Sequence, residues 1–356
     1  MNTATITIND TTFENNYAST DGGAIRGSGN ATVLNLKNVD FISNQTSNYG
    51  GAICTGAANG TFENAIFKQN SAYFGGAIHK NSGGLFTIDN ALFESNTARE
   101  QGGVIHANGS NFDISNSIFR KNESKIGGVI YVFNNSTINI TDSIFDSNVA
   151  TTSGSIIRID SANTTVTFKN SVFKNNDGKS SIVNKGTLNI ISESGKSTIF
   201  TGNIATGDSS LIENNKIANF TVKTGASLLF DNNRSEYAGV FENYSGATMT
   251  ITGEAGSIIE FNNNSAGFGS AIYNNGTFNI TADTIKFAGN TYNADGATSG
   301  GGNHDGTIYN AGTMNIDANS VLFIGNTTKR GGAIDNTGTM TLKNGYFKGN
   351  LSLIHI

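Results

Sequence analysis

The sequence predicts an all-β fold, a right-handed parallel β-helix of about 12 to 13 coils with three short strands per coil. Three observations lead to this prediction. A Phe-x-x-Asn motif recurs about every 26 residues, a Gly-Gly-Ala-Ile element follows most of its copies, and the 356-residue chain contains no Pro. Short strands that alternate apolar and polar residues cannot bury a face alone, so we expect each strand to pair in parallel with its copy in the next coil. The handedness follows from the general rule for parallel crossover connections.

The Phe-x-x-Asn motif supplies the first element of each coil. We expect its Phe rings to stack from coil to coil and its Asn amides to hydrogen-bond along the axis as a ladder. Asn also tolerates left-handed backbone geometry better than other non-Gly residues, which places it in a turn. The copies begin at Phe13, Phe41, Phe67, Phe93, Phe119, Phe145, Phe173, Phe200, Phe230, Phe261, Phe287, Phe323 and Phe347.

A Gly pair followed by two apolar residues supplies the second element, and a Gly-Thr segment with alternating apolar residues supplies the third. The Gly pair suits a sharp corner, where φ is positive or where backbones approach closely. We expect the Ile of this element to point into the core. Clear copies of the second element start at Gly22, Gly50, Gly75, Gly102, Gly127 and Gly331, and copies of the third start at Gly186, Gly276, Gly312 and Gly338.

Composition excludes several classes of protein. Only 37% of the residues are hydrophobic and Trp is absent, which argues against a thick globular core. The net charge of −5 is thinly spread, so we expect no nucleic-acid partner. Cys54 is the single Cys, and the spacings of a structural zinc site are absent, so we expect neither a disulfide framework nor a cofactor. The longest apolar runs are too short to form a transmembrane segment in this chain.

The alternating Phe-x-x-Asn and Gly-Gly-Ala-Ile elements resemble the repeats of the chlamydial polymorphic outer-membrane proteins and of similar adhesin-like proteins in other bacteria and methanogenic archaea. The resemblance covers roughly residues 1–350. It implies an extracellular or cell-surface passenger, often an adhesin, whose partner is a host or cell-surface protein or a glycan. In bacterial members a C-terminal autotransporter barrel carries the passenger. The family has no catalytic residues to transfer to this sequence.

We expect residues 1–350 to form a single β-helix domain that is truncated at both ends. A signal peptide and a membrane or cell-wall anchor would then lie outside this chain. The last six residues, 351–356, leave the repeat pattern, and we interpret them as a tail that arose as a sequencing or assembly artefact.

One outward column offers ligand-like side chains. If each Ile points inward, the residue after it points outward, which aligns Cys54, His79 and His106 on successive coils. Three such ligands could bind a transition metal. Side chains spaced by one coil lie in line and do not surround an ion, so we predict no metal site. The full column is Arg26, Cys54, His79, His106, Tyr131 and Arg158.

The segment from 291 to 305 lengthens one coil, and insertions in solenoids emerge as loops that often bind ligands. Tyr292, Asp295, His304 and Asp305 are therefore the candidate ligand-binding residues, for a sugar or for calcium. The alternative is a loop that is merely tolerated.

Many β-helices cleave polysaccharides with paired carboxylates. Here only Glu213 and Glu242 fall in one column on adjacent coils, and we expect both to be ordinary solvated side chains. We therefore predict no catalytic residues and a non-catalytic, adhesin-like passenger segment. The alternative is a carbohydrate-active β-helix enzyme, either a polysaccharide lyase or a glycoside hydrolase, or a carbohydrate-binding module.

Overall fold

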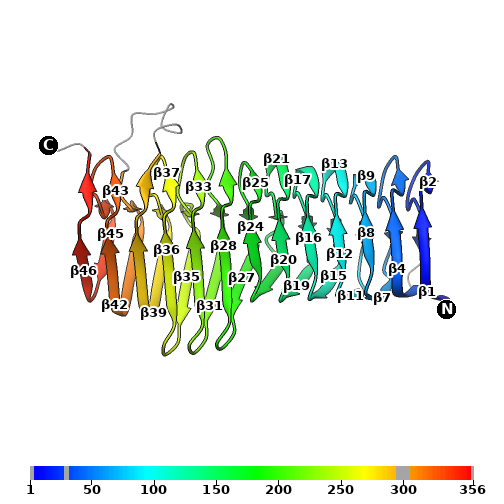
Figure 1. Ribbon diagram of the computed structural model, residues 1–356, viewed down its shortest axis with the longest axis horizontal. Helices are drawn as coiled ribbons and strands as arrows, with labels where there is room; N and C mark the ends of the chain where they lie inside the picture. Colours follow the sequence, from blue (N-terminus) through cyan, green and yellow to red (C-terminus); the bar gives the residue numbers. More distant parts are fainter. Residues whose placement is uncertain (1–3, 28–31, 294–304, 354–356) are drawn as a thin grey trace. The chain divides into compact units, whose positions relative to one another are not determined.

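A computed structural model describes residues 4–27, 32–293 and 305–353 and divides the chain into two compact units, Met1–Ser171 and Val172–Ile356. Each unit is a parallel β-helix with three sheets, called A, B and C in the order in which a coil enters them, and the described residues contain no helix. In unit 1 the strands of sheet A face the viewer and point up while the coils advance from right to left, which makes the coil right-handed (Figure 1). Among the residues that the structure describes, the sheet C strands of the two units number 12, as the repeat predicts.

Unit 1 contains the first six coils. Its sheet A strands are β1 (Ala4–Glu14), β4 (Thr32–Ile42), β7 (Asn59–Glu63), β8 (Ile66–Lys68), β11 (Leu85–Asp89), β12 (Leu92–Glu94), β15 (Asn111–Ser115), β16 (Ile118–Arg120), β19 (Thr137–Thr141), β20 (Ile144–Asp146) and β23 (Thr165–Lys169). Its sheet B strands are β2 (Tyr17–Ala18), β5 (Gln45–Thr46), β9 (Ser71–Phe74), β13 (Thr97–Gln101), β17 (Glu123–Ile126) and β21 (Val149–Ser153). Its sheet C strands are β3 (Ile25–Gly27), β6 (Ile53–Thr55), β10 (Ile78–Asn81), β14 (Ile105–Asn108), β18 (Ile130–Phe133) and β22 (Ile157–Ile159).

Unit 2 has the same organisation. Its sheet A strands are β24 (Val172–Lys174), β27 (Thr187–Ser192), β28 (Ser197–Thr201), β31 (Ile217–Val222), β32 (Ser227–Asp231), β35 (Thr248–Gly253), β36 (Ile258–Asn262), β39 (Thr277–Ala288), β42 (Thr313–Ile324), β45 (Thr339–Leu342) and β46 (Gly345–Lys348). Its sheet B strands are β25 (Asp177–Gly178), β29 (Ile204–Ala205), β33 (Arg234–Ser235), β37 (Ser265–Ala266), β40 (Thr291–Tyr292), β43 (Thr327–Thr328) and β47 (Leu351–Ser352). Its sheet C strands are β26 (Ile182–Asn184), β30 (Ile212–Asn214), β34 (Phe241–Asn243), β38 (Ile272–Asn274), β41 (Ile308–Asn310) and β44 (Ile334–Asn336).

The Phe residues of the motif form a stacked spine inside each unit, as predicted. The ring centroid of Phe67 lies 4.8 Å from that of Phe41 and 4.9 Å from that of Phe93, and the rings are within 11° of parallel. Phe261 stacks in the same way on Phe230 in unit 2, at 5.1 Å. These separations fall in the favourable range for aromatic pairs, so the spine stabilises the stacking of the coils.

The Asn residues of the motif form the predicted ladder. The backbone N–H and side-chain Nδ2 of Asn96 both donate to Oδ1 of Asn122, at 2.9 and 3.1 Å, and Nδ2 also donates to the carbonyl oxygen of Phe67, at 2.8 Å. One part of the prediction was wrong, because the ladder Asn does not take the left-handed conformation. The preceding residue does so instead, as at Ser95, where φ is 55°.

The Gly pair turns the corner before sheet C. Gly50 has a φ of +67°, and a Cβ on Gly51 would lie 2.1 Å from the carbonyl oxygen of Gly76. A side chain at the second position would therefore collide with the next coil. The following Ile points into the core, as expected, and both Ile53 and Ile78 are fully buried.

The structure adds two features to the predicted coil. The third element and the Phe strand both belong to sheet A, which bends between them at a left-handed residue such as Asn90, whereas the short strands after each ladder Asn form the separate sheet B. At the C-terminal side, β47 pairs with β43 through Thr327 and Leu351. Leu351 and Ser352 therefore add a short strand beyond residue 350.

The inward face of sheet C differs between the units. In unit 1 it contains the fully buried Lys80, whose Nζ donates to the carbonyl oxygens of Gly83 and Gly84. Burial lowers the pKa of Lys80 to about 8. In unit 2 the same face has a second amide ladder, in which Asn243 Nδ2 donates to Asn274 Oδ1 at 2.8 Å.

Candidate functional site

The outward column of sheet C in unit 1 has the register expected from the sequence. Cys54 pairs with His79, and His79 pairs with His106, one residue per coil. The column is sheltered, however, since His79 is only 6% exposed and His106 only 5%. The remaining members Arg26, Tyr131 and Arg158 follow the same register at its two ends.

Two aromatic side chains that precede the Gly pairs cover this column. The Tyr49 ring lies 4.4 Å from the His79 ring, and the Phe74 ring lies 5.3 Å from the His106 ring. The two covering rings also stack on each other at 5.1 Å. The sequence contains a signal for this cover, because Tyr49 and Phe74 each stand directly before a Gly-Gly pair, but our sequence interpretation missed it.

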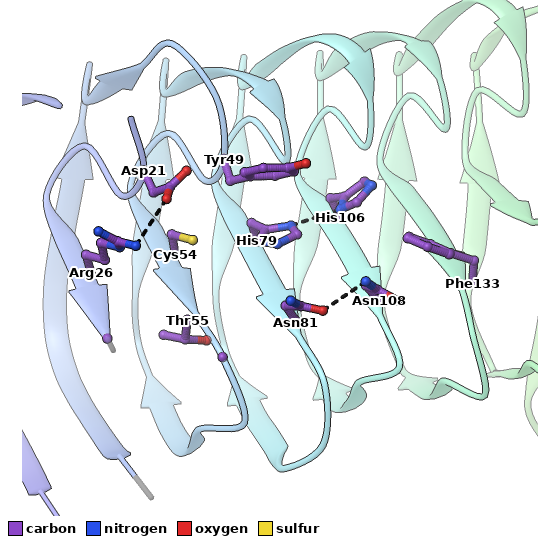
Figure 2. A pocket seen from close by; sticks show the side chains of 12 residues that line it. Asp21, Arg26, Tyr49, Cys54, Thr55, His79, Asn81, His106, Asn108 and Phe133 are labelled. Carbon is purple, nitrogen blue, oxygen red and sulfur yellow. Dashed lines mark hydrogen bonds and ion pairs between the residues drawn. The ribbon is translucent and has the colours of Figure 1, made fainter. Parts of the chain in front are cut away.

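A groove of about 500 Å³ opens beside the covered column (Figure 2). It offers aromatic rings, amides, a hydroxyl, a thiol and one pair of opposite charges within a single surface hollow. The lining residues are Asp21, Arg26, Gly27, Tyr49, Cys54, Thr55, Gly56, His79, Asn81, His106, Asn108 and Phe133.

His79 and His106 form an imidazole pair on the floor of the groove. Their Nδ1 atoms face each other at 2.9 Å (Figure 2). Nε2 of His106 lies 3.2 Å from Oε1 of Gln101. One Nδ1 must donate and the other accept, so the accepting ring is neutral. Burial lowers the pKa of His79 to about 4. Burial, followed by the nearby His79, lowers the pKa of His106 to about 3.

Polar side chains mark the two sides of the groove. At the N-terminal end Arg26 pairs with Asp21 at 3.5 Å, and burial, followed by Asp21, raises the pKa of the Cys54 thiol to about 12. Along the outer side, Asn108 Nδ2 donates to Asn81 Oδ1 at 2.8 Å. The amide hydrogen bonds thus continue from coil to coil. Because of its raised pKa, the Cys54 thiol is protonated at neutral pH.

The candidate residues in the long coil are only partly placed. Tyr292 lies in β40, with Lys329 Nζ 6.0 Å from its ring centroid, and Asp305 is buried at 3% exposure. Both line a narrow cavity with about 140 Å³ of empty space, which does not admit a water molecule. Asp295 and His304 lie outside the described residues. Ligand binding by this segment stays a prediction.

The Glu column of unit 2 also has the expected register. Glu213 pairs with Glu242 in sheet C, but Glu242 is only 5% exposed, so our expectation of a solvated side chain was wrong for this residue. Burial, followed by repulsion from Glu213, raises the pKa of Glu242 to about 7. Hydrogen bonds from Tyr244 and Ser210 lower this pKa and offset part of the rise.

Within residues 4–27, 32–293 and 305–353, no group of three or more His, Cys, Asp or Glu side chains is placed to hold a metal ion. Within the same residues, no helix has the length and apolar character needed to cross a membrane.

The stacked coils define the protein as a parallel β-helix solenoid built from short repeats. Residues 10–28 and 38–56 match the model of the Chlamydia polymorphic membrane protein repeat. These two segments therefore resemble repeats of this family, which confirms the resemblance inferred from the motifs for this part of the chain. No curated protein and no solved structure matches the chain significantly. The repeat family and the fold together fit a surface-exposed, passenger-like protein.

Proposed function

We propose that this chain is an extracellular, adhesin-like passenger segment that binds a glycan through the groove of unit 1. The observation that carries the proposal is the combination of aromatic rings and a continuous amide ladder along one open groove. Tyr49 and Phe133 offer aromatic faces, while Asn81 and Asn108 offer amides beside them. Binding sites of this kind combine apolar surface with a few polar groups that fix the ligand's orientation.

The chemistry of a sugar suits these groups. Its C–H faces pack against aromatic rings, and its hydroxyls both donate and accept hydrogen bonds, which an Asn amide matches with a donor and an acceptor. Successive coils are about 4.8 Å apart, so successive amides are offered at intervals comparable with one sugar ring of a linear glycan.

The charges of the groove favour a neutral glycan. Asp21 and Arg26 neutralise each other at one end, the His79 and His106 rings are uncharged at neutral pH, and the Cys54 thiol is protonated. An acidic glycan would find no unpaired cation among the lining residues, whereas recognition of anionic groups ordinarily uses Arg or Lys.

A glycan array and calorimetry with the purified chain test the proposal. We expect a neutral glycan to bind, and we expect an Asn81→Ala and Asn108→Ala double variant to lose at least tenfold in affinity. The matched control changes Asn279 and Asn315 to Ala, because their amides also hydrogen-bond from coil to coil, on sheet A of unit 2. The proposal would be contradicted if no glycan bound, or if both double variants lost glycan affinity equally. Binding of the chain to cells that did not change after enzymatic removal of their surface glycans would also contradict it.

A second candidate function, cleavage of a polysaccharide, has one observation in its favour. Glu242 has a pKa of about 7 beside a second carboxyl group, which is a property of general acids in glycoside hydrolysis. The 5% exposure of Glu242 limits access to a substrate. Incubation with pectin, alginate and related glycans decides the matter, since new reducing ends that disappear with Glu242→Gln would favour the enzyme.

A further inference from the structure

We propose that the facing Nδ1 atoms of His79 and His106 chelate a divalent transition metal, copper(II) or nickel(II), on the floor of the groove. This inference goes beyond glycan binding and does not depend on it. Our sequence interpretation argued against a metal because side chains on successive coils lie in line. In the structure the two rings are turned so that their Nδ1 atoms converge (Figure 2).

The distance between the two nitrogens fits a right-angled coordination geometry. The Nδ1 atoms are 2.9 Å apart. With metal–nitrogen bonds of about 2.0–2.1 Å, that separation corresponds to a nitrogen–metal–nitrogen angle of about 90°. A tetrahedral angle would require the nitrogens to be about 3.4 Å apart with the same bonds. Right angles are typical of copper(II) and nickel(II) with nitrogen and oxygen ligands, whereas zinc prefers a tetrahedron.

The protonation state of the pair suits metal binding. Metal-bound imidazoles are neutral, and burial keeps the pKa of His79 at about 4 and that of His106 at about 3, so protons do not compete at neutral pH. The proton of the Nδ1–H···Nδ1 hydrogen bond moves to Nε2 of its own ring when the metal enters. Gln101 Oε1, 3.2 Å from Nε2 of His106, then serves as the outer partner that metal-binding imidazoles ordinarily have.

The groove supplies the remaining coordination positions. Both imidazoles line its volume of about 500 Å³, which leaves room for water or for oxygen ligands. Two protein nitrogens with open positions form a weaker site than a closed structural centre. Cys54 lies one coil from His79 and is not required by this geometry.

Titration of the full chain with copper(II), nickel(II) and zinc(II) chlorides at pH 7.5 tests the proposal. We expect one copper per chain, weaker nickel binding and still weaker zinc binding. The electron paramagnetic resonance spectrum should contain coupling to two nitrogens, and labelling the chain with ¹⁵N-histidine should change that coupling without any mutation. At pH 3.5 the copper should be released, because protons then compete for the pair.

Variants locate the site. His79→Gln and His106→Gln should each lower copper affinity at least tenfold. His304→Gln with His355→Gln is the matched control, since it removes the other two of the four His residues. Cys54→Ser separates imidazole from thiolate binding and should leave affinity unchanged. The proposal would be overturned if both single His variants retained their copper affinity, or if the spectrum lacked coupling to two nitrogens. It would also be overturned if zinc bound most tightly of the three metals.

Discussion

The outward columns of sheet C in the two units share a backbone position and differ in chemistry. In unit 1 the column centres on His79 and His106, and in unit 2 it centres on Glu213 and Glu242. Burial keeps the imidazoles neutral in the first column and favours the neutral acid at Glu242 in the second. One repeat scaffold thus presents a basic group and an acidic group at equivalent sites, because the residue after the inward apolar position is not needed for stacking.

The covers over the two columns are similar in kind. Tyr49 packs on His79 in unit 1, and Tyr237 and Phe268 pack on each other and on Tyr273 in unit 2. Both covers come from the turns that connect sheet B to sheet C. An aromatic residue in this turn therefore lowers solvent access to the column, whichever side chains the column contains.

The largest effect is expected from the Asn ladder, which both units share. Asn96→Ala should leave the backbone N–H of Asn70 and the carbonyl oxygen of Phe67 without their partners. Since each buried unpaired group costs about 1–3 kcal/mol, we expect a loss of about 3–5 kcal/mol in the free energy of unfolding. Asn264→Ala in unit 2 should cost the same, measured by urea denaturation with circular dichroism.

The control for the ladder is Asn315→Ala, an exposed amide of sheet A, which should cost less than about 1 kcal/mol. A small loss in the free energy of unfolding at both ladder positions would contradict this prediction. A large loss in one unit alone would also contradict it, because the two units would then not share one stabilising scaffold.

The second expected effect is that the stabilities of the two units change in opposite directions with pH. The folded-state pKa values of His79 and His106 are below the usual 6.5, so unit 1 should lose stability as pH falls from 6.5 towards 3. The folded-state pKa of Glu242 is above the usual 4.5, so unit 2 should lose stability as pH rises from 4.5 to about 7. Shifts of this size amount to about 3 kcal/mol for His79 and Glu242 and about 5 kcal/mol for His106.

Hydrogen exchange with mass spectrometry, corrected for the intrinsic rate at each pH, can follow peptides from β10–β14 and from β30–β34 separately. His79→Gln should flatten the response of unit 1 alone, and Glu242→Gln that of unit 2 alone. If the stability of both units changed in the same direction with pH, the two columns would not have the opposite titration behaviour predicted here.

A smaller effect is expected when a cover is removed. Tyr49→Ala should expose the imidazole pair to solvent and reduce the pH response of unit 1 by about half, because burial is the main cause of the lowered pKa of His79. Tyr17→Ala, at a side chain that is already 63% exposed, is the matched control. If the pH dependence of the stability of unit 1 did not change in the Tyr49 variant, residues other than Tyr49 would shelter the imidazole pair.

The sequence was sufficient to predict the scaffold because the scaffold depends on residues that recur. Phe67, Asn96 and Gly51 each contact their own copy or its neighbour in the next coil, so their spacing reveals their role. The register of the His column followed from the same spacing.

The candidate site was less predictable because it depends on contacts between residues that do not recur. The shelter over the imidazole pair comes from the Tyr49 and Phe74 rings, and the converging Nδ1 atoms depend on side-chain rotation, which spacing does not specify. The buried Lys80 likewise breaks the apolar pattern of the inward face, and its Nζ contacts local carbonyl oxygens and the Phe86 ring.

The most direct test is an NMR pH titration of the four His residues, with His79→Gln and His106→Gln used for assignment. A sheltered imidazole pair in the groove of unit 1 predicts that His79 titrates with a pKa of about 4 and His106 with a pKa of about 3. If both instead titrate near the ordinary value of 6.5, the column is open to solvent, and the imidazole pair of unit 1 is not sheltered.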